Sequence, residues 1–278
     1  MRVIRTAAEM HEVRRGITGS VGLVATLGGI HAGHTTHMDA LRPRCDVMIG
    51  SLFLNPTQFG ENEDLSTYPA TESDDLAQFE KHGADYVFAP SVDEIYPSDE
   101  DVPAVDPGSV ANLLEGAHRP DHFAGVARVV ARLFSIISPD KSTFGEKDAQ
   151  QLRIIQHVND SLGLGIEIIP IPTVREDDGL AISSRNAYLS PEEREAASIL
   201  FKALTVAKLS FDSGERSGEV LRFMLESVLA GEPLATVDYV SIADPDTFEE
   251  LDQVEFTARA LLAVKIGDAR LIDNLLLA

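Results

Sequence analysis

Two histidines in a glycine-containing turn are the residues best suited to chemistry. The segment Ala25-Thr-Leu-Gly-Gly-Ile-His-Ala-Gly-His34 runs from an apolar strand into a turn and then a helix. We expect such a turn to present free backbone N–H groups and the positive end of a helix dipole to a phosphate. If His31 and His34 both lie on the first helical turn, they share a face and can donate to one anion. A satisfied turn with incidental histidines and a zinc site are the alternatives, and no cysteine or carboxylate at ligand spacing completes a zinc set.

A second polar segment, Asn55-Pro-Thr-Gln-Phe59, follows an apolar strand expected at residues 47–54. It would lie at the carboxyl end of that strand, where ligands of open α/β sheets bind. The amides of Asn55 and Gln58 suit a hydroxy acid or a ribose. A plain Asn-Pro turn would explain the same residues.

A third segment, Gly145-Glu-Lys-Asp-Ala-Gln-Gln151, again lies between a strand and a helix. Lys147 can hold phosphate oxygens there, while Asp148 caps the helix or meets a ribose hydroxyl or Mg²⁺. Gln151 would point from the first helical turn towards the same crevice. An ordinary surface helix with an acidic cap is the alternative.

Two loops complete the candidates. Ser183, Ser184 and Arg185 stand in the segment 178–186, where hydroxyls and a guanidinium on a closing loop would stabilise charge on a triphosphate. Arg119, in the polar loop 118–122, can steer an anionic substrate. A capped linker and a solvent-exposed loop are the respective alternatives.

The elements that must position these residues follow a βα pattern. Short apolar, β-branched runs alternate with amphipathic stretches, which predicts parallel strands joined by crossover helices. We expect strands at 22–27, 47–54, 85–89, 142–144 and 166–171, and helices at 34–43, 74–82, 126–137 and 149–162, with Gly83 ending the second helix.

Beyond residue 172 the pattern changes to helices at 191–209 and 218–230, followed by strands at 237–242 and 259–266. The predicted fold class is therefore α/β, with a Rossmann-like parallel sheet and a smaller α+β domain at the carboxyl end. We place the domains at 1–173, for nucleotide and substrate binding, and 174–278, as a lid.

The composition limits the partners and the location. A formal charge of −22, with six lysines, opposes binding to nucleic acid and favours small-molecule substrates. Acidic segments such as Asp74-Asp75 and residues 99–101 are interpreted as solvated faces and loops, and the acidic excess also favours a high-salt cytoplasm. The sequence contains neither a long apolar run nor a secretory signal, so we expect no membrane span and a cytoplasmic protein.

Taken together and in this order, the segments resemble the pantothenate synthetase family, within the nucleotidyltransferases named for a His-x-Gly-His motif. The most specific parts are the turn from His31 to His34, Ser51-Leu-Phe-Leu-Asn-Pro-Thr-Gln-Phe59, Phe144-Gly-Glu-Lys-Asp-Ala-Gln-Gln-Leu152, Pro172-Thr-Val-Arg-Glu176 and the stretch 180–189. The carboxyl-terminal part matches mainly at Val237-Asp-Tyr and Leu271-Ile-Asp-Asn. The resemblance implies condensation of pantoate with β-alanine, with cleavage of ATP to AMP and pyrophosphate in the presence of Mg²⁺, by a homodimer.

The resemblance also implies roles for individual residues. His34 is the proposed proton donor, and His31, Lys147 and Arg185 are further catalytic residues. Gln58 and Gln151 match the pair that holds pantoate, with Gln58 also near β-alanine; Asn55, Tyr68 and Arg119 are supporting positions. The implied ATP site comprises Leu27, Gly28, Gly29, Ile30, His31, Ala32, Gly33, His34, Gly145, Glu146, Lys147, Asp148, Val174, Ile182, Ser183, Ser184 and Arg185.

The turn departs from the family pattern Pro-Thr-Met-Gly-Ala-Leu-His-Glu-Gly-His. Leu27 nearly conserves the volume of the usual methionine, whereas Ala25, Gly29 and Ala32 differ more, and we expect the last two to affect ATP affinity. Two alternative functions share the histidine turn. One is a nucleotidyltransferase that transfers AMP or CMP to a phosphate, and the other is a nucleotide-binding protein without catalysis.

Overall fold

The computed structural model describes residues 1–60, 63–69, 71–98 and 104–278, which form two compact units. The first unit comprises Met1–Glu146 and Gln150–Pro172, and the second comprises Lys147–Ala149 and Thr173–Ala278. The division into functional domains at residue 173 stays a prediction. The acidic segment 99–101 lies outside the described residues.

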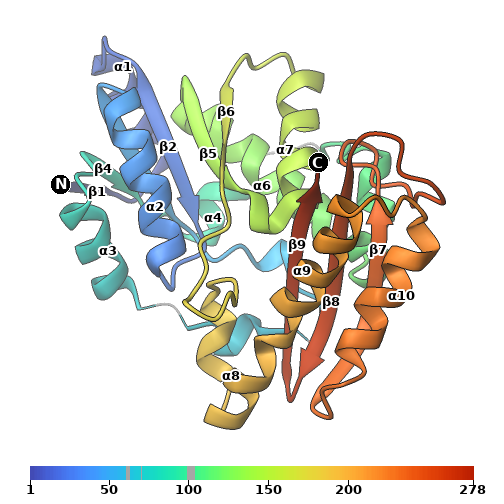
Figure 1. Cartoon of the computed structure of the whole chain (residues 1–278). Coiled ribbons are helices and arrows are strands. Elements are labelled where there is room, and N and C mark those ends of the chain that lie inside the picture. The colour runs from blue at the N-terminus through green and yellow to red at the C-terminus, as the bar shows by residue number, and fades with distance from the viewer. Residues whose placement is uncertain (61–62, 70, 99–103) are drawn as a thin grey trace. The chain divides into compact units, whose positions relative to one another are not determined.

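The first unit is built on a six-stranded parallel sheet with the order β1-β4-β3-β2-β5-β6 (Figure 1). Strand β2 pairs with both β3 and β5, while the chain leaves β2 towards β3 and leaves β5 towards β6. The topological switch point therefore lies between β2 and β5, and ligands of open α/β sheets bind outside the carboxyl ends of such strands. The strands are β1 Arg2–Ile4, β2 Val21–Thr26, β3 Val47–Leu52, β4 Tyr86–Phe88, β5 Lys141–Gly145 and β6 Glu167–Ile171.

Helices cover both faces of this sheet. Leu23 and Ile49 pack in one core with α1 and α6, whereas Val24 and Met48 pack in another with α2 and α3. Because both faces are buried, the central strands are almost continuously apolar, which is why they could be predicted. The helices are α1 Ala7–Gly16, α2 Ala32–Leu41, α3 Glu72–Lys81, α4 Val92–Ile95, α5 Glu115–His118, α6 His122–Ile137 and α7 Ala149–Ser161.

The second unit is a three-stranded antiparallel sheet, β7-β8-β9, packed against helices. Alternate residues of β8, among them Ala260, Leu262 and Val264, share a core with Leu204 and Leu225. The elements are α8 Pro191–Ala197, α9 Ile199–Asp212, α10 Gly218–Leu229, β7 Ala235–Ala243, β8 Ala258–Ile266 and β9 Ala269–Leu277. The predicted fold class, a parallel α/β sheet with a smaller α+β part, is confirmed.

Several boundaries differ from the sequence prediction. The helix expected at 34–43 begins two residues earlier, because His31 and not a later residue provides its N-cap. The helix expected at 191–209 is interrupted at Ser198, whose hydroxyl and N–H both bond to the Glu195 carbonyl at the end of α8. Strand β9 was not predicted, because Asp273 and Asn274 interrupt its apolar pattern.

Candidate active site

The turn after β2 has the conformation that its glycines allow. Gly28 and Gly29 have φ angles of 97° and 65°, in the left-handed region that side chains disfavour. Gly29, where the turn departs from the family pattern, occupies a backbone position where glycine is the least strained residue.

A buried carboxylate occupies part of the turn. Asp75 of α3 is 3% exposed, and its two oxygens accept from the N–H of Gly29 at 3.0 Å and of Ile30 at 2.7 Å. Two interpretations from the sequence are therefore wrong. Asp75 is not part of a solvated face, and these two N–H groups are not free to bind phosphate, because a carboxylate from a distant helix already satisfies them.

His31 and His34 form a capping box at the start of α2. Nδ1 of His31 accepts from the N–H of Gly33 at 3.1 Å, and Nδ1 of His34 accepts from the N–H of His31 at 3.3 Å. The two rings stack with centroids 4.0 Å apart. An Nδ1 that accepts leaves the proton of a neutral imidazole on Nε2. In the neutral form of each ring the remaining proton is therefore on Nε2, and His31 precedes the first helical turn instead of lying on it.

The segment after β3 fixes the side chain of Gln58. Asn55 is fully buried; its Nδ2 donates to Gln58 Oε1 at 3.0 Å, and its Oδ1 accepts from the Tyr96 hydroxyl at 3.0 Å. Asn55 also caps the short 3-10 helix Pro56–Gln58, so the turn that the sequence offered as an alternative is present as well. With Oε1 occupied by Asn55, the remaining polar atom of Gln58 is the donor Nε2.

Arg119 belongs to a partly buried polar cluster and does not stand as an isolated cation. Its guanidinium bonds both oxygens of Glu63 at 2.7 Å and approaches His122 Nε2 at 3.2 Å. Burial opposes ionisation of Glu63, but Arg119 outweighs it and lowers the pKa of that carboxyl.

His122 connects this cluster to Gln58. Burial, reinforced by the charge of Arg119, lowers the pKa of His122 to about 4, so the ring is neutral at pH 7. Its Nε2 then accepts from Arg119, and its Nδ1–H donates to the Gln58 carbonyl at 2.8 Å. Arg119 and His122 thus support the backbone of Gln58.

The segment after β5 separates its two glutamines. Gln150 is buried and bonds the N–H of Glu115 and the carbonyls of Val110 and Leu113. Gln151 is half-buried and remains the candidate ligand. Lys147 belongs to the second unit, where its Nζ lies 3.7 Å from Asp148 Oδ1.

Residues 174–182 form a small hairpin in the second unit. The N–H of Ile182 donates to the Val174 carbonyl at 2.9 Å, and Arg175 pairs with Ala181 in an antiparallel bridge. Ser183 then caps the 3-10 helix Ser184–Tyr188. Val174 and Ile182 are therefore neighbours across the hairpin, and the segment with Ser184 and Arg185 follows directly.

Neither a protein metal site nor a membrane helix is found among the described residues. Within those ranges no three histidine, cysteine, aspartate or glutamate side chains gather as a metal-binding group. No described helix is long and apolar enough to cross a membrane.

Sequence reasoning missed the residues that support the candidates. Asp75, Tyr96 and His122 each contact a candidate segment from more than 35 positions away along the chain. Asp75 and His122 had been noticed only as parts of polar runs. Their burial was the missing signal, and a single sequence does not reveal it.

Imidazole and amide donors that follow adjacent parallel strands at a switch point are typical of α/β enzymes that act on small anionic substrates. The chain belongs to the Pantoate-beta-alanine ligase family, whose model matches residues 2–276. It is 50% identical over 277 residues to the pantothenate synthetase of Roseiflexus sp. (strain RS-1), covering 100% of this chain and 99% of the relative.

Two solved structures agree with this assignment. The crystal structure of pantothenate synthetase from Thermus thermophilus has a TM-score of 0.93 at 40% identity, covering 99% of both chains. The pantoate-beta-alanine ligase of Francisella tularensis, crystallised with beta-gamma ATP and beta-alanine, has a TM-score of 0.82 at 32% identity, covering 99% of this chain and 97% of the other.

Proposed function

We propose that this chain condenses pantoate with β-alanine to give pantothenate, AMP and pyrophosphate through a pantoyl-adenylate intermediate. The observation that carries the proposal is the stacked His31–His34 pair, whose Nδ1 atoms accept backbone N–H groups at the start of α2 and so fix both rings directly after the turn that follows β2. Family membership supports it, as does the Francisella relative, which was crystallised with beta-gamma ATP and beta-alanine.

The reaction has two covalent steps. In the first, a carboxylate oxygen of pantoate attacks the α-phosphorus of ATP in line, and the bond to the departing pyrophosphate breaks. In the second, the neutral amine of β-alanine attacks the acyl carbon, the C–N bond forms, the C–O bond to AMP breaks, and the amine proton passes to solvent. Protein donors lower both barriers by stabilising the negative charge that develops on phosphate oxygens.

We assign that charge stabilisation to His31, His34, Lys147 and Arg185, with His34 as proton donor and the hydroxyls of Ser183 and Ser184 assisting. The remaining residues of the proposed ATP site are Leu27, Gly28, Gly29, Ile30, Ala32, Gly33, Gly145, Glu146, Asp148, Val174 and Ile182. The backbone N–H groups of Gly29 and Ile30 shape the turn and do not bind phosphate, since Asp75 holds them.

We assign pantoate to Gln58 and Gln151, and β-alanine to Gln58. The fixed orientation of the Gln58 amide supports this role, because its Nε2–H group suits an oxygen acceptor of pantoate. Asn55 supports Gln58 directly and Arg119 supports it through His122. Tyr68, which contacts the Phe59 ring edge-on, is a further supporting position.

Three further assignments rest on the sequence and on the family resemblance. Mg²⁺ would neutralise charge on the triphosphate. We also propose a homodimer, which light scattering would test, and a cytoplasmic location.

The first experiment follows ATP, AMP, pyrophosphate and pantothenate by mass spectrometry with pantoate and Mg²⁺, with and without β-alanine. Pyrophosphate and AMP rising in step with pantothenate would establish the ligase. ATP binding without turnover at low and high salt would contradict it.

His34→Asn is the sharpest variant for the histidine pair. Asparagine retains a short acceptor for the N–H of His31 but removes the Nε2–H donor, so stability should hold while kcat falls about 100-fold or more. His37→Asn, in the same helix, is the matched control and should stay near wild type. Equal kcat values for the two variants would remove His34 from the mechanism.

A further inference from the structure

An ion pair inside the second unit stands between two candidate ATP-site segments. Asp273 of β9 has a side chain 1% exposed, and its carboxylate accepts two bonds from Arg175, at 2.6 and 2.9 Å. A buried carboxylate with a two-point guanidinium partner has a fixed geometry, because both partners lose most of their hydration unless they stay together.

Arg175 also holds the turn of the 174–182 hairpin. One guanidinium nitrogen donates to the Gly179 carbonyl at 3.0 Å, and the ring of Phe201 lies 4.2 Å from the guanidinium carbon. Gly179 has a φ angle of 92°, and a Cβ there would overlap the same ring. The hairpin is thereby packed tightly between α9 and β9.

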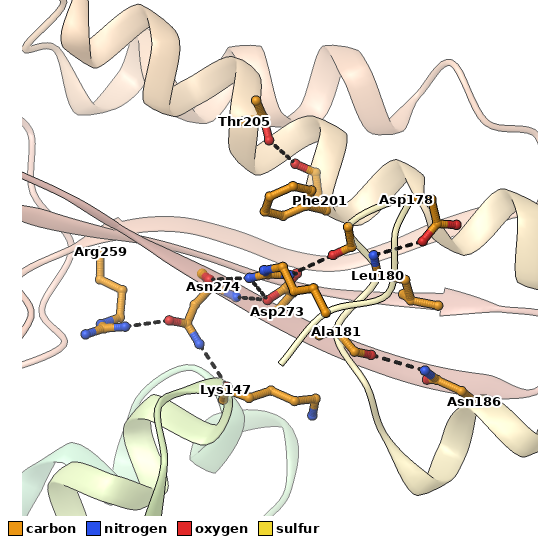
Figure 2. Close-up of polar contacts among 12 residues, drawn as sticks. Lys147, Asp178, Leu180, Ala181, Asn186, Phe201, Thr205, Arg259, Asp273 and Asn274 are labelled. Carbon is orange, nitrogen blue, oxygen red and sulfur yellow. Dashed lines mark hydrogen bonds and ion pairs between the residues drawn. The ribbon is translucent and has the colours of Figure 1, made fainter. Parts of the chain in front are cut away.

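The same strand holds the backbone of Lys147. Asn274 is buried; its Nδ2 donates to the Lys147 carbonyl at 2.8 Å, and its Oδ1 accepts from Arg259 (Figure 2). These two bonds settle the orientation of the amide. The backbone groups of Asn274 on the open edge of β9 are satisfied as well, since its N–H donates to Asp273 and its carbonyl accepts from Arg175.

We propose that Arg175, Asp273 and Asn274, here called the β9 network, are positioning residues for ATP. Asp273 and Asn274 are adjacent on β9: Asp273 fixes, through Arg175, the hairpin that carries Val174 and Ile182, and Asn274 fixes the carbonyl of Lys147. Asn186 extends the connection, because its Nδ2 donates to the Ala181 carbonyl at 3.1 Å and so ties the 3-10 helix with Ser184 and Arg185 back to the hairpin. The inference rests on the proposed function, in which these segments bind ATP.

The test variant is Asn274→Asp. It keeps an oxygen for Arg259 but turns an acceptor towards the Lys147 carbonyl, so it breaks one bond of the network with little change in volume. We expect the KM for ATP to rise about tenfold, with the KM values for pantoate and β-alanine near wild type. Arg270→Gln, a change on the same strand as Asn274 that breaks the ion pair between Arg270 and Asp238 of β7, is the matched control and should leave all three KM values unchanged.

A second pair of variants separates positioning from folding. Arg175→Lys keeps the charge but forms fewer bonds, so its KM for ATP should lie between those of wild type and Arg175→Ala. A general loss of folded protein would lower the apparent kcat and leave the KM values alone. A KM for ATP within twofold of wild type in Asn274→Asp would overturn the inference.

Calorimetric ATP binding distinguishes failure of the network from failure of the proposed function. If wild type binds ATP without making pantothenate and Asn274→Asp binds about tenfold more weakly, the network stands and the ligase assignment falls. Equal affinities overturn the network whatever the turnover. A wild-type protein that does not bind ATP overturns it too.

Discussion

Two candidate segments are each held by a buried aspartate, but the partners differ in kind. Asp75 in the first unit accepts from two backbone N–H groups of the glycine turn. Asp273 in the second unit accepts from a guanidinium and from one backbone N–H. Removing Asp75 leaves neutral donors without an acceptor, whereas removing Asp273 leaves a largely buried cation. The second loss is the more costly, since an unpaired buried charge is harder to accommodate than an unpaired amide.

The largest effect should come from Asp273→Ala, which we expect to lower the free energy of unfolding by about 4 kcal/mol. Chemical denaturation would measure it, with Asp238→Ala as the control, because that side chain belongs to a more exposed ion pair of the same sheet. The double variant Arg175→Met, Asp273→Leu should recover most of the stability by removing both charges together. It should not recover the affinity for ATP. Equal losses of unfolding free energy in Asp273→Ala and Asp238→Ala would mean that burial of the Arg175–Asp273 pair adds nothing to the cost of removing its aspartate.

The sequence predicts the features that arise from local patterns and misses the partners that come from distant parts of the chain. The apolar runs of β2 and β3 and the glycine turn are local patterns, so five of the six strands of the sheet and the histidine pair could be predicted, whereas β1 and α1 were not. The partners of the candidates could not, because Asp75 and Gly29 are far apart in sequence, as are Arg175 and Asp273. Asp and Asn are depleted in strands, so Asp273 and Asn274 argue against a strand when only the sequence is known. Arg175, which bonds to both, cannot be identified from the sequence, and β9 was missed for that reason.

His122 is a third buried titratable group, and its surroundings keep it neutral at pH 7. Burial and Arg119 lower the pKa of His122 to about 4 from an ordinary 6.5. Between those values the unfolded chain binds more protons than the folded one, so stability is full above the upper value and is lost as the pH falls towards the lower. The loss should amount to about 3 kcal/mol.

Urea unfolding between about pH 4 and pH 7 would measure this slope. His122→Gln should flatten it, whereas His118→Gln, an exposed neighbour, should leave it intact. A slope that survives His122→Gln would assign the acid sensitivity to other groups.

Asp75→Asn tests the two bonds that the Asp75 carboxylate accepts from backbone N–H groups of the glycine turn. An amide keeps one oxygen for the turn but directs N–H against the second donor, so we expect a loss of about 2 kcal/mol in unfolding free energy. The KM for ATP should rise as the turn relaxes, while that for β-alanine should stay constant. Asp74→Asn, its exposed neighbour in α3, should match wild type in both measurements. An unchanged KM for ATP in Asp75→Asn would mean that the turn keeps its shape without the carboxylate.

Gly29→Ala should have the smallest effect and isolates the backbone from the aspartate. With φ at 65°, alanine is strained but keeps the N–H that donates to Asp75, so we expect a loss of about 1 kcal/mol in unfolding free energy. The opposing contribution is entropic, because alanine restricts the unfolded chain more than glycine does. Thermal unfolding measures whether the backbone strain in the folded state or the lower entropy of the unfolded chain has the larger effect. A gain in stability would mean that position 29 escapes the left-handed conformation in the variant, and that the bond to Asp75 does not determine the backbone there.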